Sequence, residues 1–377
     1  MNSPQPKRGG WLWEHFYTAL RSARDLFQRP RMSAADRILF FKRMSILLSA
    51  GIPVSECLAM AKDQSANARL RDLIDALIRD TQNGKSLSRS LGKFPHVYGA
   101  FTLHMISVGE ASGTLSQNFE YIAEELRKSR ILKQKIVSAL LYPGLITAAT
   151  LVLTGFLILY LFPKLMPIFL SLRMQLPLST RVIIAVSQFL TQYGLLLIGA
   201  LIVGAIISTL LRIRVPRVNI ALTHALLRAP IGRVLIQNYH LAQSARSLGL
   251  LLKSGIPLSP ALSLIARMTR NPLYRTEWFA IASAIDRGEK MSERMRRSAL
   301  LFPPVASQMI AVGERSGHMA ATLLYLSDMY EHEFDEYTKS LSSLLEPVLM
   351  IFMGFLIGIV AISIITPIYG LTEHLHA

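Results

Sequence analysis

Three long stretches of the chain carry no charged residue, and they outline the molecule. No Asp, Glu, Lys or Arg occurs within residues 136–163, 182–211 or 347–372. Each stretch is rich in Leu, Ile, Val, Phe and Gly, and each exceeds the ~20 residues that an α-helix needs to cross a bilayer. The pattern predicts three transmembrane helices, at residues 144–163, 182–211 and 347–369.

The segments outside these stretches have apolar residues at helical spacing. A Ser-Ala-Ala-Asp sequence that begins at Ser33 is typical of a helix N-terminus. Gly51 and Pro53 then end one helix and start the next, since Gly suits the left-handed position after a helix and Pro the first turn. Gly84 closes a third helix, and Gly113 is the turn residue of a later corner. No strand is predicted, so we expect an all-α protein with soluble bundles of about six helices.

The soluble segments contain an internal repeat at a constant offset of 204 residues. Leu-Leu-Ser-Ala-Gly-Ile-Pro-Val-Ser at residues 47–55 returns as Leu-Leu-Lys-Ser-Gly-Ile-Pro-Leu-Ser at 251–259, and Val-Gly-Glu-Ala-Ser-Gly at 108–113 returns as Val-Gly-Glu-Arg-Ser-Gly at 312–317. The offset changes only locally, where Phe94-Pro95 corresponds to Phe302-Pro303. From there to its Val-Gly-Glu, the second copy is four residues shorter than the first. The sequence therefore predicts two homologous helical domains, each leading into a span, with the span at 182–211 inserted between them.

The positive charge of the chain marks the two domains. The 377 residues hold 41 Lys and Arg against 24 Asp and Glu, a net charge of +17. Residues 1–135 hold 21 basic against 12 acidic residues, residues 212–346 hold 17 against 11, and residues 163–181 hold three basic residues. Because basic residues collect on the cytoplasmic side of spans, both domains and the N-terminus are placed in the cytoplasm. Anionic membrane lipid is an expected contact. No compact basic stripe with interleaved aromatics indicates nucleic-acid binding.

These signals predict eight segments along the chain. They are an N-terminal extension (1–33), a first cytoplasmic helical domain (34–143), a transmembrane helix (144–163), a periplasmic loop (164–181), a second transmembrane helix (182–211), a second cytoplasmic helical domain (212–346), a third transmembrane helix (347–369) and a periplasmic tail (370–377). The extension lacks the apolar core and cleavage site of a signal peptide. Its apolar residues fit one face of a short helix on a bilayer or on the protein: Trp11, Leu12, Phe16 and Leu20.

Catalytic and metal-binding signatures do not occur in the sequence. Gly84-Lys85-Ser86 resembles the end of a phosphate-binding loop, but Arg79 stands where that loop needs its first Gly. The single cysteine, Cys57, excludes an intramolecular disulfide and indicates a small buried side chain. His374 and His376 form a tail pair that we expect to be solvated. We therefore predict no enzyme, no cofactor and no metal.

The repeated motifs supply the candidate functional residues, each with two interpretations. Glu110 and Glu314 lie at the same corner of the two domains. They either bind a partner cation, such as an Arg or a divalent metal ion, or accept backbone N–H bonds from the start of the next helix. The other candidates are partner contacts or helix corners: Gly51, Pro53, Gly109, Gly113, Gly255, Pro257, Gly313 and Gly317.

Three residues at the start of spans complete the candidates. Pro143 and Pro347 stand at the same offset, and Glu346 precedes the last span, where a carboxylate costs little if it lies at the cytoplasmic interface. An acidic run is interpreted most simply as a solvated helix face, with contact to a partner as the alternative: Asp328, Glu331, Glu333, Asp335 and Glu336.

Together these residues resemble the type II secretion F-protein and type IV pilus PilC family. The resemblance rests on the paired Gly-Ile-Pro and Val-Gly-Glu motifs, a Leu-Leu-Glu-Pro sequence at residues 344–347, Leu-Pro-Leu-Ser-Thr at 176–180 and Thr-Pro-Ile-Tyr at 366–369, and it covers residues 34–371. It implies a platform protein of the bacterial inner membrane that oligomerises. Its implied partners are a hexameric assembly ATPase, pilin or pseudopilin subunits and other inner-membrane assembly proteins.

Two further functions compete with this one. A transporter is suggested by the duplication, yet most repeated residues lie in soluble domains, whereas transporter repeats lie within the membrane. A membrane-tethered nucleic-acid binder is suggested only by the net charge. A type IV pilus, a secretion pseudopilus and a DNA-uptake filament all remain open as the product.

Overall fold

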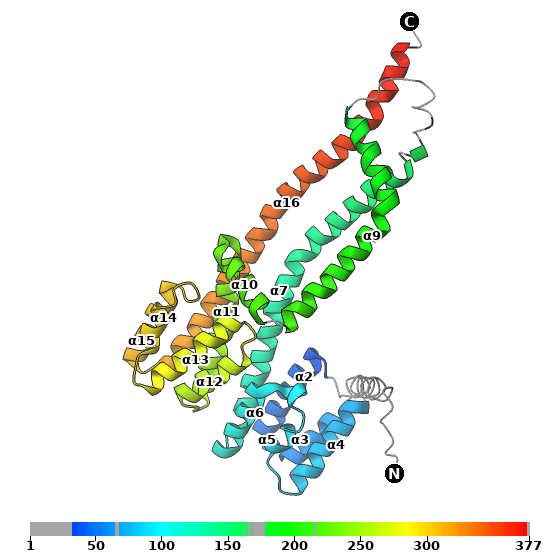
Figure 1. Ribbon diagram of the computed structural model, residues 1–377. Helices are drawn as coiled ribbons and strands as arrows, with labels where there is room; N and C mark the ends of the chain where they lie inside the picture. Colours follow the sequence, from blue (N-terminus) through cyan, green and yellow to red (C-terminus); the bar gives the residue numbers. More distant parts are fainter. Residues whose placement is uncertain are drawn as a thin grey trace, which may run out of the picture. The chain divides into compact units, whose positions relative to one another are not determined.

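The computed structural model describes residues 32–64, 68–161, 178–214 and 216–374, with residues 163, 164 and 167 between them. All regular structure in these ranges is helical, which confirms the all-α prediction for the described part of the chain (Figure 1). The apolar face expected in the N-terminal extension lies outside these residues, as does most of the predicted loop at 164–181.

The chain divides into two compact units. The first comprises residues 1–128 together with residues 250–257, and the second comprises residues 129–249 and 258–377. Helices of the first unit are α2 (Ala34–Ser49), α3 (Val54–Asp63), α4 (Ala68–Gln82), α5 (Leu87–Leu91), α6 (Pro95–Ser112) and the first part of α7 (Leu115–Phe156).

An aromatic cluster forms the core of the first unit. Phe41 is fully buried and stacks on Phe119 at 5.6 Å between ring centroids, and Tyr98 meets Phe41 edge-on at 5.9 Å. The N-cap predicted at Ser33 is confirmed, because the Ser33 hydroxyl accepts the backbone N–H of Asp36 at 3.1 Å. Helices α2, α6 and α7 thus meet around rings that their apolar faces supply.

The second unit repeats this helix order and adds the apolar segments. After the end of α7 and a π-helical turn at Leu157–Leu161, its helices are α9 (Leu178–Arg214), α10 (Pro216–Arg228), α11 (Pro230–Lys253), α12 (Leu258–Met268), α13 (Pro272–Asp286), α14 (Met291–Arg296), α15 (Pro304–Ser316) and α16 (Met319–His374). Its core also centres on aromatics. Phe302 meets Trp278 at 5.2 Å and Tyr274 at 5.9 Å.

Glycines in the left-handed region repeat at the predicted offset. The φ angles are +82° at Gly51 and +89° at Gly255, and +70° at Gly113 and +73° at Gly317. Side chains with a Cβ rarely adopt these angles, so each pair marks a turn that requires Gly. Gly84 and Gly288 form a third such pair.

Two helices are long and apolar enough to cross a membrane, and a third candidate is bent. The two are Leu115–Leu161 and Met319–Ser363, and the bent pair Arg181–Gly194 with Gly199–Ser208 makes a third if it counts as one span. Apolar side chains on these helices lack protein cover, as expected for lipid-facing residues: Val152 is 72% exposed and Ile351 74%. The chain is thus a membrane protein with up to three candidate spans.

Both long helices continue unbroken from the soluble part into the apolar segment. Helix α7 runs through Pro143 and α16 runs through Pro347 without a break in the helical backbone. Where α7, α9 and α16 meet, Ile183 and Val360 are buried against residues of the π-helical turn. The Ser187 hydroxyl donates to the carbonyl of Ile158 (2.8 Å) in that turn, where the regular helical bonding pattern changes.

Candidate functional site

Both Val-Gly-Glu corners place their glutamate at the start of a short helix. The Glu110 carboxylate accepts the backbone N–H groups of Leu87 and Ser88, the latter at 2.9 Å, at the N-terminus of α5. The Glu314 carboxylate accepts the backbone N–H of Met291 at 2.6 Å, and both the N–H and the hydroxyl of Ser292, at the start of α14. One interpretation from the sequence was that each glutamate accepts backbone N–H bonds from the start of the next helix. It was wrong in that detail, since the bonded helix lies 22 or 23 residues earlier in sequence.

The glycine of each corner allows two helices to approach closely. A Cβ at Gly109 would lie 2.9 Å from Asn118 Nδ2 and 3.0 Å from the Cα of Leu115. At Gly313, the corresponding Cβ would lie 2.9 Å from Thr322 Oγ1 and 3.0 Å from its Cβ. Asn118 and Thr322 stand at the repeat offset, so both corners use the same close packing.

The Gly-Ile-Pro corners are helix corners in both repeats. In the first, the N–H of Gly51 bonds to the carbonyl of Leu48 at 3.0 Å, and Pro53 stands directly before α3. In the second, Gly255 bonds to Leu252 at 3.0 Å, and Pro257 directly precedes α12.

The second Gly-Ile-Pro corner packs on first-repeat residues within the first unit. The Ser254 hydroxyl donates to Asn118 Oδ1 at 3.0 Å, while Asn118 Nδ2 donates to the carbonyl of Met105 at 2.9 Å. Lys253 lies over the ring of Tyr121 with its Nζ 5.0 Å from the centroid. Sequence reasoning missed this site. Its only signal is that Lys253 and Ser254 depart from the Ser and Ala of the first repeat.

The Lys and Ser side chains of the Gly-Lys-Ser sequence at residues 84–86 make structural contacts. The carboxylate of Asp80 binds Lys85 at 2.8 Å and also binds Lys93. These two ammonium groups lower the pKa of Asp80 to about 2. Ser86 is the N-cap of α5, and helix α4 precedes the sequence, so it has no resemblance in structure to a phosphate-binding loop.

A buried ion network joins α11 to α16 in the second unit. The Arg246 guanidinium, whose side chain is 6% exposed, donates to Glu331 at 2.7 Å, to Asp328 at 3.0 Å and to the Ser327 hydroxyl. Ser327 in turn donates to the carbonyl of Ala242 at 2.7 Å. The interpretation of the acidic run as a solvated face is therefore wrong for Glu331, which is buried against Arg246.

The residues at the start of the first and third spans differ in their contacts. The backbone carbonyl of Pro143 accepts a hydrogen bond from the Thr147 hydroxyl (2.7 Å), while Glu346 and Pro347 are exposed on α16.

Cys57 is buried, as its sequence context indicated, and burial raises the pKa of its thiol. Within the described ranges, no three His, Cys, Asp or Glu residues are grouped to hold a metal ion.

Comparison with known proteins finds the internal repeat as two matches to one protein family. The family model for type II secretion system (T2SS), protein F, matches residues 40–163 and again residues 244–367, so the two matches are displaced by the offset of the internal repeat. The type IV pilus assembly protein TapC of Aeromonas hydrophila is 28% identical over 94% of this chain and 86% of its own length.

Two proteins of Pseudomonas aeruginosa are similarly related. Its type II secretion system protein F is 30% identical over 91% of this chain and 84% of its own length, and its type IV pilus assembly protein PilC is 28% identical over 90% and 91%. The chain therefore belongs to the type II secretion system protein F family, whose members are non-enzymatic membrane platform proteins of bacterial type II secretion and type IV pilus systems.

Proposed function

We propose that the chain couples a cytoplasmic hexameric ATPase to the insertion or extraction of pilin-like subunits at the inner membrane. Family membership supports the class of machine, and the relatives named above are pilus assembly and secretion proteins rather than solute carriers. The proposed partners are the ATPase, pilin or pseudopilin subunits, other inner-membrane assembly proteins and further copies of this chain.

The observation that carries the proposal is the continuity of α7 and α16. Helix α7 has 42 residues and α16 has 56, which correspond to roughly 60 and 80 Å at ~1.5 Å per residue. Each begins directly after a Val-Gly-Glu corner and ends in an apolar segment. Because a helix transmits displacement along its axis, movement imposed on a soluble corner reaches the membrane.

Contacts within the second unit join the two helices before the spans predicted at 144–163 and 347–369 begin. Lys135 Nζ of α7 lies 3.3 Å from Asp335 Oδ1 of α16, and the Ser342 hydroxyl of α16 donates to the carbonyl of Ala139 at 3.4 Å. A partner that moves one helix at this level therefore also acts on the other.

The proposed orientation places the N-terminus and both helical domains in the cytoplasm, with three spans. The basic residues that gather before the first span, within residues 127–135, and after the second, within residues 212–217, support it. This arrangement gives both domains access to one ATPase.

A deletion strain tests the proposed function. We expect loss of surface filaments or of secretion, with pilin synthesis unchanged, and recovery on expression of the wild-type chain. Normal filaments and normal secretion in the deletion strain would overturn the assignment.

A further inference from the structure

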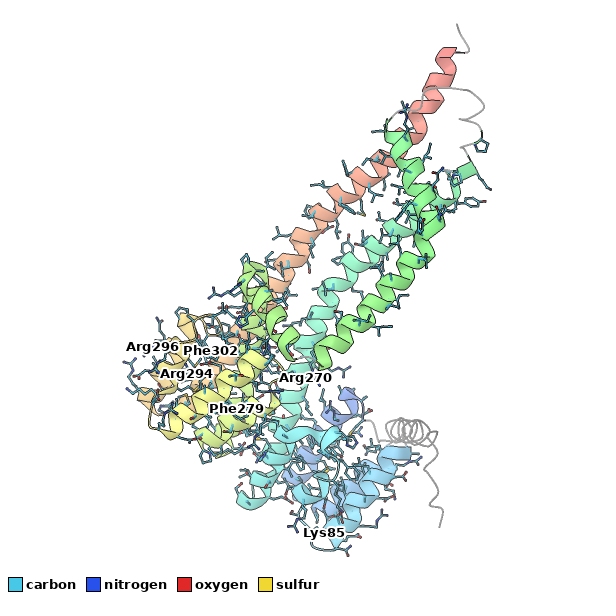
Figure 2. All side chains as sticks on the ribbon, viewed as in Figure 1. Lys85, Arg270, Phe279, Arg294, Arg296 and Phe302 are labelled. Carbon is cyan, nitrogen blue, oxygen red and sulfur yellow. The ribbon has the colours of Figure 1, made fainter. Side chains whose placement is uncertain are left out.

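A charged hollow of about 400 Å³ lies between α14 and α15 in the second unit. Three exposed cations line it: Lys290 precedes α14, Arg296 ends α14, and Arg315 lies near the end of α15. Figure 2 shows Arg296 at the outer edge of this part of the molecule. Side chains that line the hollow are therefore open to a ligand from solvent.

Neighbouring cations are paired, whereas these three are not. Arg294 binds Glu277 at 2.9 Å, and Arg287 and Arg297 both bind Glu289. Among the described residues, no carboxylate forms an ion pair with the three cations of the hollow. The Nε atoms of Arg296 and Arg315 reach only backbone carbonyls, at 3.4 and 3.3 Å.

The two carboxylates of the hollow do not cancel this charge. Glu314 is engaged by the N-terminus of α14, through the bonds to Met291 and Ser292. Glu293 is exposed and is the other acidic residue of the lining. Three positive charges therefore face Glu293, the one carboxylate of the lining that is not bonded to backbone N–H groups at the start of α14.

The first repeat has no cation at two of these three positions. At the offset of 204 residues, Ser86 and Ala111 occupy the positions of Lys290 and Arg315, whereas Arg296 lies where the second repeat has four extra residues. Glu110 nevertheless binds the start of α5 as Glu314 binds the start of α14. Since the same corner forms without cations at these two positions, Lys290 and Arg315 in the second repeat call for another explanation.

We propose that this hollow binds an acidic segment of a partner protein through Asp or Glu side chains. Arginine binds carboxylates in bidentate geometry, and the Gln308 side chain offers a further donor at the wall. No aromatic residue lines the hollow, so a nucleotide base would find no ring on which to stack. The acidic segment thus fits the lining better than a nucleotide does.

The test uses the full chain in an uncharged detergent and a fluorescein-labelled peptide of alternating Glu and Ser. Binding is followed by fluorescence anisotropy. Replacing the three cations together (Lys290→Gln, Arg296→Gln, Arg315→Gln) should weaken binding at least about 10-fold, because the attraction is electrostatic. The Glu293→Gln variant should bind the peptide about 2-fold more tightly, because it removes a repulsive charge.

A matched control removes three exposed cations outside the hollow, with Arg71→Gln, Arg267→Gln and Arg270→Gln. This variant should bind within about 2-fold of wild type, since distant exposed charges are screened by salt. Equal loss in both triple variants would overturn the proposal, as attraction to net charge alone would explain it. Binding of ATP or pyrophosphate that depends on the three cations, without binding of the peptide, would also overturn it. Unchanged thermal unfolding of the triple variants shows that altered binding is not a folding defect.

Discussion

The carboxylates of Glu110 and Glu314 bind N–H groups that have no partner within their own short helices. Replacing either residue by Ala should lower the free energy of unfolding by about 1–3 kcal/mol, because buried donors lose a charged acceptor. Gln should cost less, since it keeps one acceptor oxygen. Denaturant unfolding of the detergent-solubilised protein measures the change. Glu293→Ala, at an exposed position, should change it by less than about 0.5 kcal/mol.

Close packing at Gly109 and Gly313 gives a second test at single positions. An Ala Cβ would approach Asn118 or Thr322 to 2.9 Å, so we expect Gly109→Ala and Gly313→Ala each to destabilise the protein by about 1–3 kcal/mol. Gly144→Ala in α7 is the control, because no neighbouring atom lies within 4 Å of its Cβ position. If thermal unfolding shows the same shift for all three variants, close packing is not the cause.

His240 makes part of the stability dependent on pH. Burial lowers its pKa to about 4 from 6.5, so the unfolded chain binds more protons between those values. Its contribution is complete above pH 6.5 and decreases as the pH falls toward 4, by about 3 kcal/mol in all. His240→Phe keeps a ring against Tyr274, stacked at 4.3 Å, and should flatten the pH profile of the unfolding temperature. His318→Gln, at an exposed site, should leave the profile as in wild type.

Residues that act within their own turn were predictable, whereas residues with distant partners were not. Ser33, Gly51 and Gly113 have local roles, which follow from helix capping and the left-handed backbone. Arg246 meets Glu331 across 85 residues of sequence, and periodicity gives no indication of such a partner.

At the scale of elements, the apolar stretches located the long helices, but they did not indicate where those helices begin. Helices α7 and α16 start at the Val-Gly-Glu corners, well before the predicted spans at 144–163 and 347–369. Hydropathy reports only the apolar part of a helix. The packing of Ser254 on Asn118 was equally hidden, because the two residues lie 136 positions apart in the sequence.

The continuity of α16 is itself testable. Ser340 is exposed in the soluble part of this helix, so Ser340→Pro removes a helical hydrogen bond without disturbing a buried side chain, at a cost of about 3 kcal/mol. We expect membrane insertion to persist and filament assembly or secretion to fail. Ser340→Ala should complement a deletion strain fully. Full complementation by Ser340→Pro would show that α16 tolerates a second proline as it tolerates Pro347, and that coupling does not depend on an intact turn at this position.

For the whole molecule, the number of spans decides which side of the membrane the second helical domain occupies. With α7, α9 and α16 all crossing, both helical domains lie on one side. With only the two unbent helices crossing, the domains lie on opposite sides. The segments at residues 1–135 and 212–346 each carry an excess of basic residues, which favours three crossings and a cytoplasmic location for both.

Single cysteines distinguish these arrangements. In a chain with Cys57→Ala, which removes the one native thiol, Arg71→Cys and Arg270→Cys report on the two helical domains and Ser171→Cys on the connection between spans. A membrane-impermeant maleimide applied to intact spheroplasts should label only Ser171→Cys, and lysis should expose the other two. Labelling of Arg270→Cys in intact spheroplasts would mean that α9 does not cross. The second domain, with its charged hollow, would then be out of reach of a cytoplasmic ATPase.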